Sequence, residues 1–168
     1  MENTIVELKF SLDTFYFLVS GILVMWMAAG FAMLEAGLVR SKNTTEILTK
    51  NVALYSIACT MFLLVGYNIM YVDNAEGGII PSIGALIGTQ AADADHSLES
   101  DFFFQVVFVA TAMSIVSGAV AERMKLFAFL AFAVVLTGFI YPMEGYWTWG
   151  GGFLSEMGFV DFAGSAIV

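Results

Sequence analysis

The sequence has 168 residues, of which 60% are hydrophobic and only 12% are charged, and its mean hydropathy is +0.85. Soluble domains carry about 25% charged residues, so this composition indicates an integral membrane protein. A net charge of −9 argues against nucleic acid as a partner, because nucleic-acid binding needs a basic surface. One cysteine and one histidine are too few for a Cys-based zinc site, an intrachain disulfide or paired-histidine chemistry. We therefore expect no metal site and no cofactor.

Four uncharged apolar runs, each of roughly 18–21 residues, are long enough to cross the hydrocarbon core as helices. The predicted fold class is therefore an all-α integral membrane bundle. With their flanking residues, the four predicted spans cover about 13–38, 47–72, 101–122 and 125–146. The first ten residues, MENTIVELKF, lack the positively charged start of a secretory signal peptide, so none is expected.

The positive charges gather around two of the connections between these spans. Of the six Lys and Arg residues, all but Lys9 lie around the connection between spans one and two or that between spans three and four. By the positive-inside rule both connections are cytoplasmic and the N-terminus is outside. Residues 73–101 and 144–161 hold nine Asp and Glu and no Lys or Arg, and so are predicted to face outward. We predict a multi-pass protein of the cell membrane.

Two further segments are assigned no chemistry. The apolar loop Ile79–Gly88 is too short to cross the membrane, and we expect it at the surface or shallowly in the interface. In span three, Ala110, Ser114 and Gly118 are four residues apart. This spacing places small side chains on one helix face and favours close contact with a neighbouring helix.

Three segments in order along the chain resemble the ammonium transporter family (Amt/Mep/Rh). GFAMLEAGLVRSKN (30–43) resembles its first helix, and FFFQVVFVATAMSIVSGAVAER (102–123) resembles its third. WGGGFLSEMGFVDFAGSAIV (149–168) resembles the loop that enters its fifth helix. The resemblance implies that residues 1–168 are the N-terminal part of a single ammonium transporter-type membrane domain, with a fifth span beginning at about residue 161. It further implies an eleven-helix bundle, a homotrimer, one conduction path through each protomer, and a first pore histidine just after Val168.

The same resemblance implies three residues of an outer cation site. Trp149 aligns with the family's binding-site tryptophan, and Phe108 with the first of two phenylalanines stacked across the pore entrance. A Trp face attracts a cation by about 0.5–2 kcal/mol, which suits a small dehydrated ammonium ion. Asp161 aligns with a largely buried aspartate that shapes the site without touching the ion. The plain alternatives are an interfacial aromatic, a packing phenylalanine and a helix N-cap, respectively.

Other candidates have weaker support. Gln105 lines the vestibule or bonds a neighbouring helix, and Ser165 lies where the fifth helix faces the pore. Gly150 and Gly151 are expected to permit a tight loop beside the mouth. Trp147 is interpreted as an interfacial aromatic, Glu122 as a surface partner of Arg123, and Glu35 as a partner of Arg40 or of a neighbouring helix.

We therefore predict ammonium transport across the membrane rather than an enzymatic activity. The expected partners are ammonium, lipid and copies of the same chain, with methylammonium left open. One alternative is an ammonium sensor of the same fold, coupled to a cytoplasmic regulator or a fused signalling domain. Another is a structural membrane module without a ligand. The sequence alone does not separate transport from sensing, because both need the same mouth.

Overall fold

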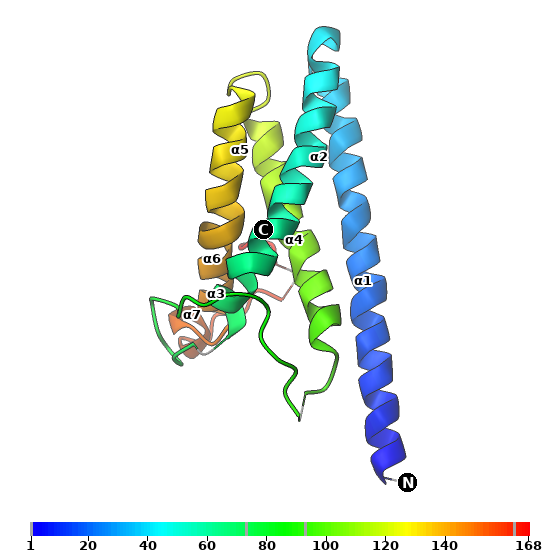
Figure 1. The fold of residues 1–168 in the computed structure, drawn as a ribbon, viewed down its shortest axis with the longest axis vertical. Helices are drawn as coiled ribbons and strands as arrows, with labels where there is room; N and C mark the ends of the chain where they lie inside the picture. Colours follow the sequence, from blue (N-terminus) through cyan, green and yellow to red (C-terminus); the bar gives the residue numbers. More distant parts are fainter. Residues whose placement is uncertain (1, 73, 93, 163) are drawn as a thin grey trace.

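A computed structural model describes residues 2–72, 74–92, 94–162 and 164–168. Within these ranges every regular element is helical, and four helices are long and apolar enough to cross a membrane (Figure 1). The prediction of an all-α membrane bundle is confirmed. The elements are α1 (Glu2–Leu38), η1 (Ser41–Asn43), α2 (Thr44–Met61), η2 (Phe62–Gly66), α3 (Tyr67–Tyr71), α4 (Leu98–Ala119), α5 (Leu126–Val135), η3 (Leu136–Ile140), α6 (Tyr141–Thr148) and α7 (Phe153–Glu156).

The first helix begins at Glu2, before the predicted membrane span that starts at about residue 13. No glycine or proline interrupts the chain before Gly21, so nothing ends the helix early. Its 37 residues extend about 55 Å at 1.5 Å per residue, well beyond a hydrocarbon core of about 30 Å. Only 6% of its most apolar 18-residue stretch is buried, and the helix lies at the edge of the bundle (Figure 1).

The second and fourth spans each contain one π-helical turn, η2 and η3, and these turns pack against each other. Pro142 has no backbone N–H and cannot continue an α-helical ladder, which accounts for the wider turn just before it. Gly66 and Gly138 allow the close approach. A Cβ at Gly66 would lie 3.0 Å from Pro142 Cγ, and one at Gly138 would lie 2.7 Å from Met61 Cε.

Helix α4 packs against α1 and α2. Its small residues Ala110 and Ser114 are buried, so small side chains lie where the helices meet. On α1, Gly21 serves the same purpose, since a Cβ there would lie 2.7 Å from the ring of Phe103. Close helix packing therefore rests on small residues from both helices.

The two ends of the bundle differ in charge. The connections at 39–43 and 120–125 lie at one end, and both carry Lys or Arg. The acidic segments at 74–92, 94–97 and 149–160 lie at the other end, together with the N-terminal part of α1 (Figure 1). This separation of basic and acidic connections agrees with the arrangement that the positive-inside rule requires. The orientation in the membrane stays a prediction.

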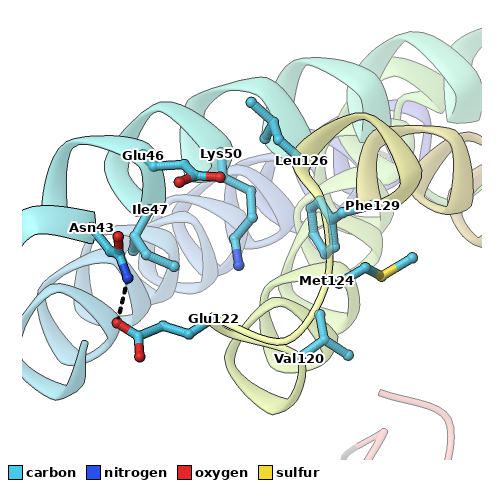
Figure 2. A pocket seen from close by; sticks show the side chains of 9 residues that line it. All are labelled: Asn43, Glu46, Ile47, Lys50, Val120, Glu122, Met124, Leu126 and Phe129. Atoms are coloured by element: carbon cyan, nitrogen blue, oxygen red, sulfur yellow. Dashed lines mark hydrogen bonds between the residues drawn. The ribbon is translucent and has the colours of Figure 1, made fainter. Parts of the chain in front are cut away.

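At the basic end, Glu122 joins the two connections, so its predicted pairing with Arg123 is wrong. Its carboxylate accepts bonds from Arg40 N (2.9 Å), Arg40 Nε (3.0 Å) and Asn43 Nδ2 (2.6 Å). Figure 2 shows the bond from Asn43 across a pocket of about 230 Å³ into which Lys50 points. The side chains of two adjacent residues such as Glu122 and Arg123 point in different directions. The fold instead brings two donors of Arg40 and one of Asn43 to the Glu122 carboxylate. The Arg40 backbone N–H and the Asn43 amide lower the pKa of Glu122.

Glu35 does not pair with Arg40 but faces α2 and α4. It is 3% exposed, and its Oε2 accepts bonds from Ser117 Oγ (2.8 Å) and Asn51 Nδ2 (3.2 Å). Lys50 Nζ lies 3.8 Å from the same oxygen and donates to the Ser117 carbonyl oxygen at 3.0 Å. A buried ion pair therefore ties three helices together near the basic end of the bundle.

Residues 161–168 end the described chain. Within residues 161–162 and 164–168, Val168 N donates one helical backbone bond to Gly164 O at 2.8 Å. Ile167 and Val168 pack against the larger group of buried apolar residues in the bundle, which includes Phe62, Met70 and Val107. The start of a fifth span at about residue 161 stays a prediction.

Candidate functional site

A cavity of about 480 Å³ opens at the acidic end of the bundle. Nine residues from α1, α3, α4 and the segment after α6 line it, and six of the nine are aromatic. The lining residues are Phe17, Tyr71, Asp101, Phe104, Gln105, Phe108, Trp149, Phe162 and Gly164. We call this space the aromatic cavity. Its walls offer π faces, one amide and one carboxylate.

One face of α4 supplies four of these residues. Asp101, Phe104, Gln105 and Phe108 follow the spacing i, i+3, i+4, i+7, which places them in one row along a helix. Phe104 meets Phe108 edge to face, with ring centroids 5.1 Å apart. It meets Phe17 of α1 in the same way, with centroids 5.2 Å apart. The three rings therefore pack edge to face in a row along the wall of the cavity, with Phe104 between the other two.

Trp149 follows the end of α6 and is held at both its backbone and its ring. Its N–H donates to Gly145 O at 2.7 Å, and its indole Nε1 donates to the Asp161 carbonyl oxygen at 3.1 Å. A Cβ at Gly164 would lie 3.5 Å from the far edge of the ring. Because the indole N–H is already bonded within the protein, the ring presents carbon and its π face to the cavity.

The glycines after Trp149 shape the loop and do not line the cavity. A Cβ at Gly150 would collide with the Met70 carbonyl oxygen, and Gly151 has a φ of +82°. A Cβ at Gly152 would lie 2.6 Å from Trp147 Cα. Close approach at two positions and a left-handed backbone at the third explain why three glycines occur together.

Asp161 lies behind Trp149 rather than in the cavity wall. It is 7% exposed, and its Oδ2 accepts the backbone N–H groups of Ala166 (3.0 Å) and Ile167 (3.1 Å). An N-cap side chain bonds donors two or three residues ahead, so these donors, five and six residues ahead, do not form an N-cap. The carboxylate anchors the segment whose carbonyl oxygen orients the indole.

The other aromatic near the mouth has a different environment. Trp147 Nε1 donates to Ile79 O at 2.7 Å, and its ring meets Phe153 edge to face at 5.5 Å. Trp147 does not line the aromatic cavity. It fastens the loop after α3 to the end of α6.

The sequence profile described as the Ammonium Transporter Family matches residues 15–168. The chain belongs to the ammonium transporter family. It is 45% identical to ammonium transporter Amt2 of Haloferax mediterranei, over 87% of this chain and 33% of that one. It is 39% identical to ammonium transporter Amt2 of Archaeoglobus fulgidus, over 93% of this chain and 35% of that one.

The solved structures include a similar fold. A protein named "Sensor Amt Protein" matches with a TM-score of 0.88 and 31% identity, over all of this chain and 42% of that one. The chain spans about a third of the length of the two curated relatives. As predicted from its motifs, it is a member of this transporter family rather than of an enzyme family.

In this ammonium transporter family chain, the residues predicted from the sequence fall into four groups, one of which is the pair of loop glycines Gly150 and Gly151 described above. Trp149, Phe108 and Gln105 line one cavity, and Asp161 lies just behind it. The exposed Ser165 does not line the cavity.

Sequence reasoning missed the remaining cavity residues. Asp101 and Phe104 share a helix row with Gln105 and Phe108, so extending that row along α4 could have found them. Phe17 comes from another helix, and no local pattern in the sequence marks it.

Proposed function

We propose that this protein transports ammonium across the cell membrane and that the aromatic cavity recruits the cation. Membership of the ammonium transporter family supports the substrate. The observation that carries the site is the meeting of Trp149, Phe108 and Gln105, from two separate segments, in one cavity at the acidic end of the bundle.

The chemistry of ammonium suits such a cavity. A bare charge is costly in hydrocarbon, so a site must replace the lost water with other favourable contacts. Trp149 and Phe108 supply π faces, each worth about 0.5–2 kcal/mol to a cation. Gln105 adds an amide oxygen that accepts an N–H bond. The buried Asp161 holds Trp149 in place and adds a negative field without contacting the ion.

The proposal extends to the assembly and its setting. The protein lies in the cell membrane with its N-terminus outside, so the cavity faces the exterior. Its functional form is a homotrimer, and methylammonium is accepted in place of ammonium. The distribution of Lys and Arg supports the orientation. Resemblance to the family supports the trimer, and the uptake assay described below tests methylammonium.

A sensor of the same fold is the second candidate. The similar solved structure favours it, because that protein is named "Sensor Amt Protein". A sensor would bind ammonium in the same cavity and pass the signal to a cytoplasmic regulator or to a fused signalling domain. Ammonium binding without ammonium-dependent current, in liposomes that hold the native protein, would select the sensor.

Trp149→Ala tests the cavity directly. The substitution is made in the native gene, so that the complete native polypeptide is purified and placed in liposomes. From the cation–π energy we expect ammonium affinity and the apparent KM for methylammonium uptake to weaken by roughly 2- to 30-fold. Trp147→Ala is the matched control, because Trp147 is a neighbouring tryptophan that does not line the cavity. Equal behaviour of the two variants would favour a structural module without a ligand.

A further inference from the structure

A second cavity, of about 510 Å³, lies directly beside the aromatic cavity. It is bounded by residues 87–91, 94 and 96 of the connection between α3 and α4, and by the adjoining parts of those two helices. Two residues, Tyr71 and Asp101, line both spaces. The ring of His96, in the second cavity, stacks on Phe17 of the aromatic cavity at a centroid distance of 4.4 Å. The two cavities are therefore neighbours, with Asp101 at their boundary.

Asp101 is half-buried in the first turn of α4. The hydroxyl of Tyr67 donates to its Oδ2 at 2.7 Å, which fixes the side chain at the boundary. An ionised carboxylate offers about four acceptor positions, so the Tyr67 hydroxyl and the neighbouring Gln105 amide still leave acceptor positions for a ligand.

The charge of Asp101 has no lysine or arginine beside it. No Lys or Arg is among the described residues that line either cavity. The one Lys at this end of the bundle, Lys9, pairs instead with Asp95 at 2.7 Å, and Asp95 lines neither space. His96, which lines the second cavity, is the one basic side chain among the described residues that line either space, so the carboxylate faces both cavities without a lysine or arginine partner and attracts a cation.

We propose that Asp101 is a cation-binding residue at the threshold of the aromatic cavity and that it sets affinity for small ammonium-type cations. This inference rests on the proposed function and adds a residue to its site. The carboxylate accepts N–H bonds from the ion as it leaves water, while the rings of Phe104 and Tyr71 face its other side. Ammonium and methylammonium carry N–H donors that can bond the carboxylate, whereas a fully alkylated ammonium carries none.

A structural role is the alternative, since a carboxylate in the first turn of a helix also stabilises the helix dipole. Glu99 separates the two explanations. It is another first-turn acid of α4, only two residues away, but it is exposed and lines neither cavity. Glu99→Gln removes the same charge from the same helix end and leaves both cavities intact.

The test compares Asp101→Asn with Glu99→Gln in the complete native polypeptide. Calorimetry gives the dissociation constants of ammonium and methylammonium, and uptake into liposomes gives KM and maximal rate. We expect Asp101→Asn to weaken both affinities about tenfold, as loss of one charged hydrogen bond implies, with the maximal uptake rate within about twofold of wild type. Glu99→Gln should leave all of these values unchanged. The effect should persist at high salt, because a direct contact is screened far less than distant steering.

Two outcomes overturn the inference. One is an Asp101→Asn protein with unchanged affinity, whatever its stability. The other is an equal loss of affinity in Glu99→Gln, which would mean a general charge effect. Trp149→Ala, measured alongside, keeps the two proposals apart. If that variant loses affinity and Asp101→Asn does not, the proposed function stands and only this inference fails, whereas both fail if neither variant changes.

A second variant covers the case in which Asp101→Asn does not accumulate in the membrane. Asp101→Glu keeps the charge and moves it outward by one methylene. We expect this longer carboxylate to change the ratio of ammonium to methylammonium affinity about threefold or more, because it alters the space beside the ion. An unchanged ratio would overturn the inference.

Discussion

Lys50→Met should destabilise the protein by about 3–5 kcal/mol, the usual cost of leaving a buried charge without its partner. Glu35 and Lys50 are 3% and 6% exposed, so little water reaches the Glu35 carboxylate to replace the lost contact. In the variant, the Glu35 carboxylate keeps two neutral donors, from Ser117 and Asn51. Its Oε1 has no hydrogen-bond partner among the described residues even before the substitution. Methionine matches the length of the lysine stem, so a new cavity adds little to the cost.

Glu35→Gln in the Lys50→Met background should recover much of the loss, because an amide in place of the carboxylate removes the unbalanced charge. The measurement is the free energy of unfolding from SDS titration in mixed micelles, for both single variants and the double variant. Lys42→Met is the control, since Lys42 is exposed and should change the free energy by less than about 0.5 kcal/mol. A Lys50→Met cost below about 1 kcal/mol, or a double variant as unstable as the sum of the singles, would refute the reasoning.

Two further predictions concern the loops at the ends of the bundle. Gly150→Ala should sharply reduce the folded protein recovered from membranes, because its Cβ collides with the Met70 carbonyl oxygen; Gly30→Ala, which meets no atom within 4 Å, should be recovered normally. The pKa of Glu122 is lowered when folded, so its link to Arg40 stabilises the protein above the ordinary value of 4.5 and is lost as pH falls through the lowered one. Stability should therefore fall less between neutral pH and pH 3 in Glu122→Gln than in wild type, and an equal fall would contradict the assignment.

The long elements could be predicted from the sequence because each depends on local composition. Four apolar runs between charged connections specify four helices, however those helices pack against one another. The π-helical turns were not predicted, because they need a contact between two spans. Pro142 indicates the π-helical turn η3 in the fourth span. The matching turn η2 in the second span becomes evident only from the contact between Gly66 and Pro142.

Residues of the site could be predicted only where they belong to a local sequence motif or follow helical spacing from a residue in such a motif. Trp149 and Phe108 are found through their motifs, and Gln105 follows from its place near Phe108 on α4. The partners of Glu35 and Glu122 lie on other helices or connections, more than ten residues away in sequence, and charge alone does not choose among them. These pairings depend on how α1, α2 and α4 cross, which hydropathy does not determine.

Helix α4 runs between the two ends of the bundle, and its length separates the proposed cation site from the buried ion pair. Asp101 lies at the cavity in its first turn, and Ser117 contacts the buried ion pair near its last turn. The two residues are sixteen positions apart, which is about 24 Å of helix at 1.5 Å per residue. Side chains that far apart with no shared partner usually contribute additively. Loss of Lys50 should therefore lower stability without weakening cation affinity, whereas loss of the Asp101 charge should do the reverse. If both effects followed either substitution, α4 would have to transmit strain along its length, and the site could not be treated as a local structure.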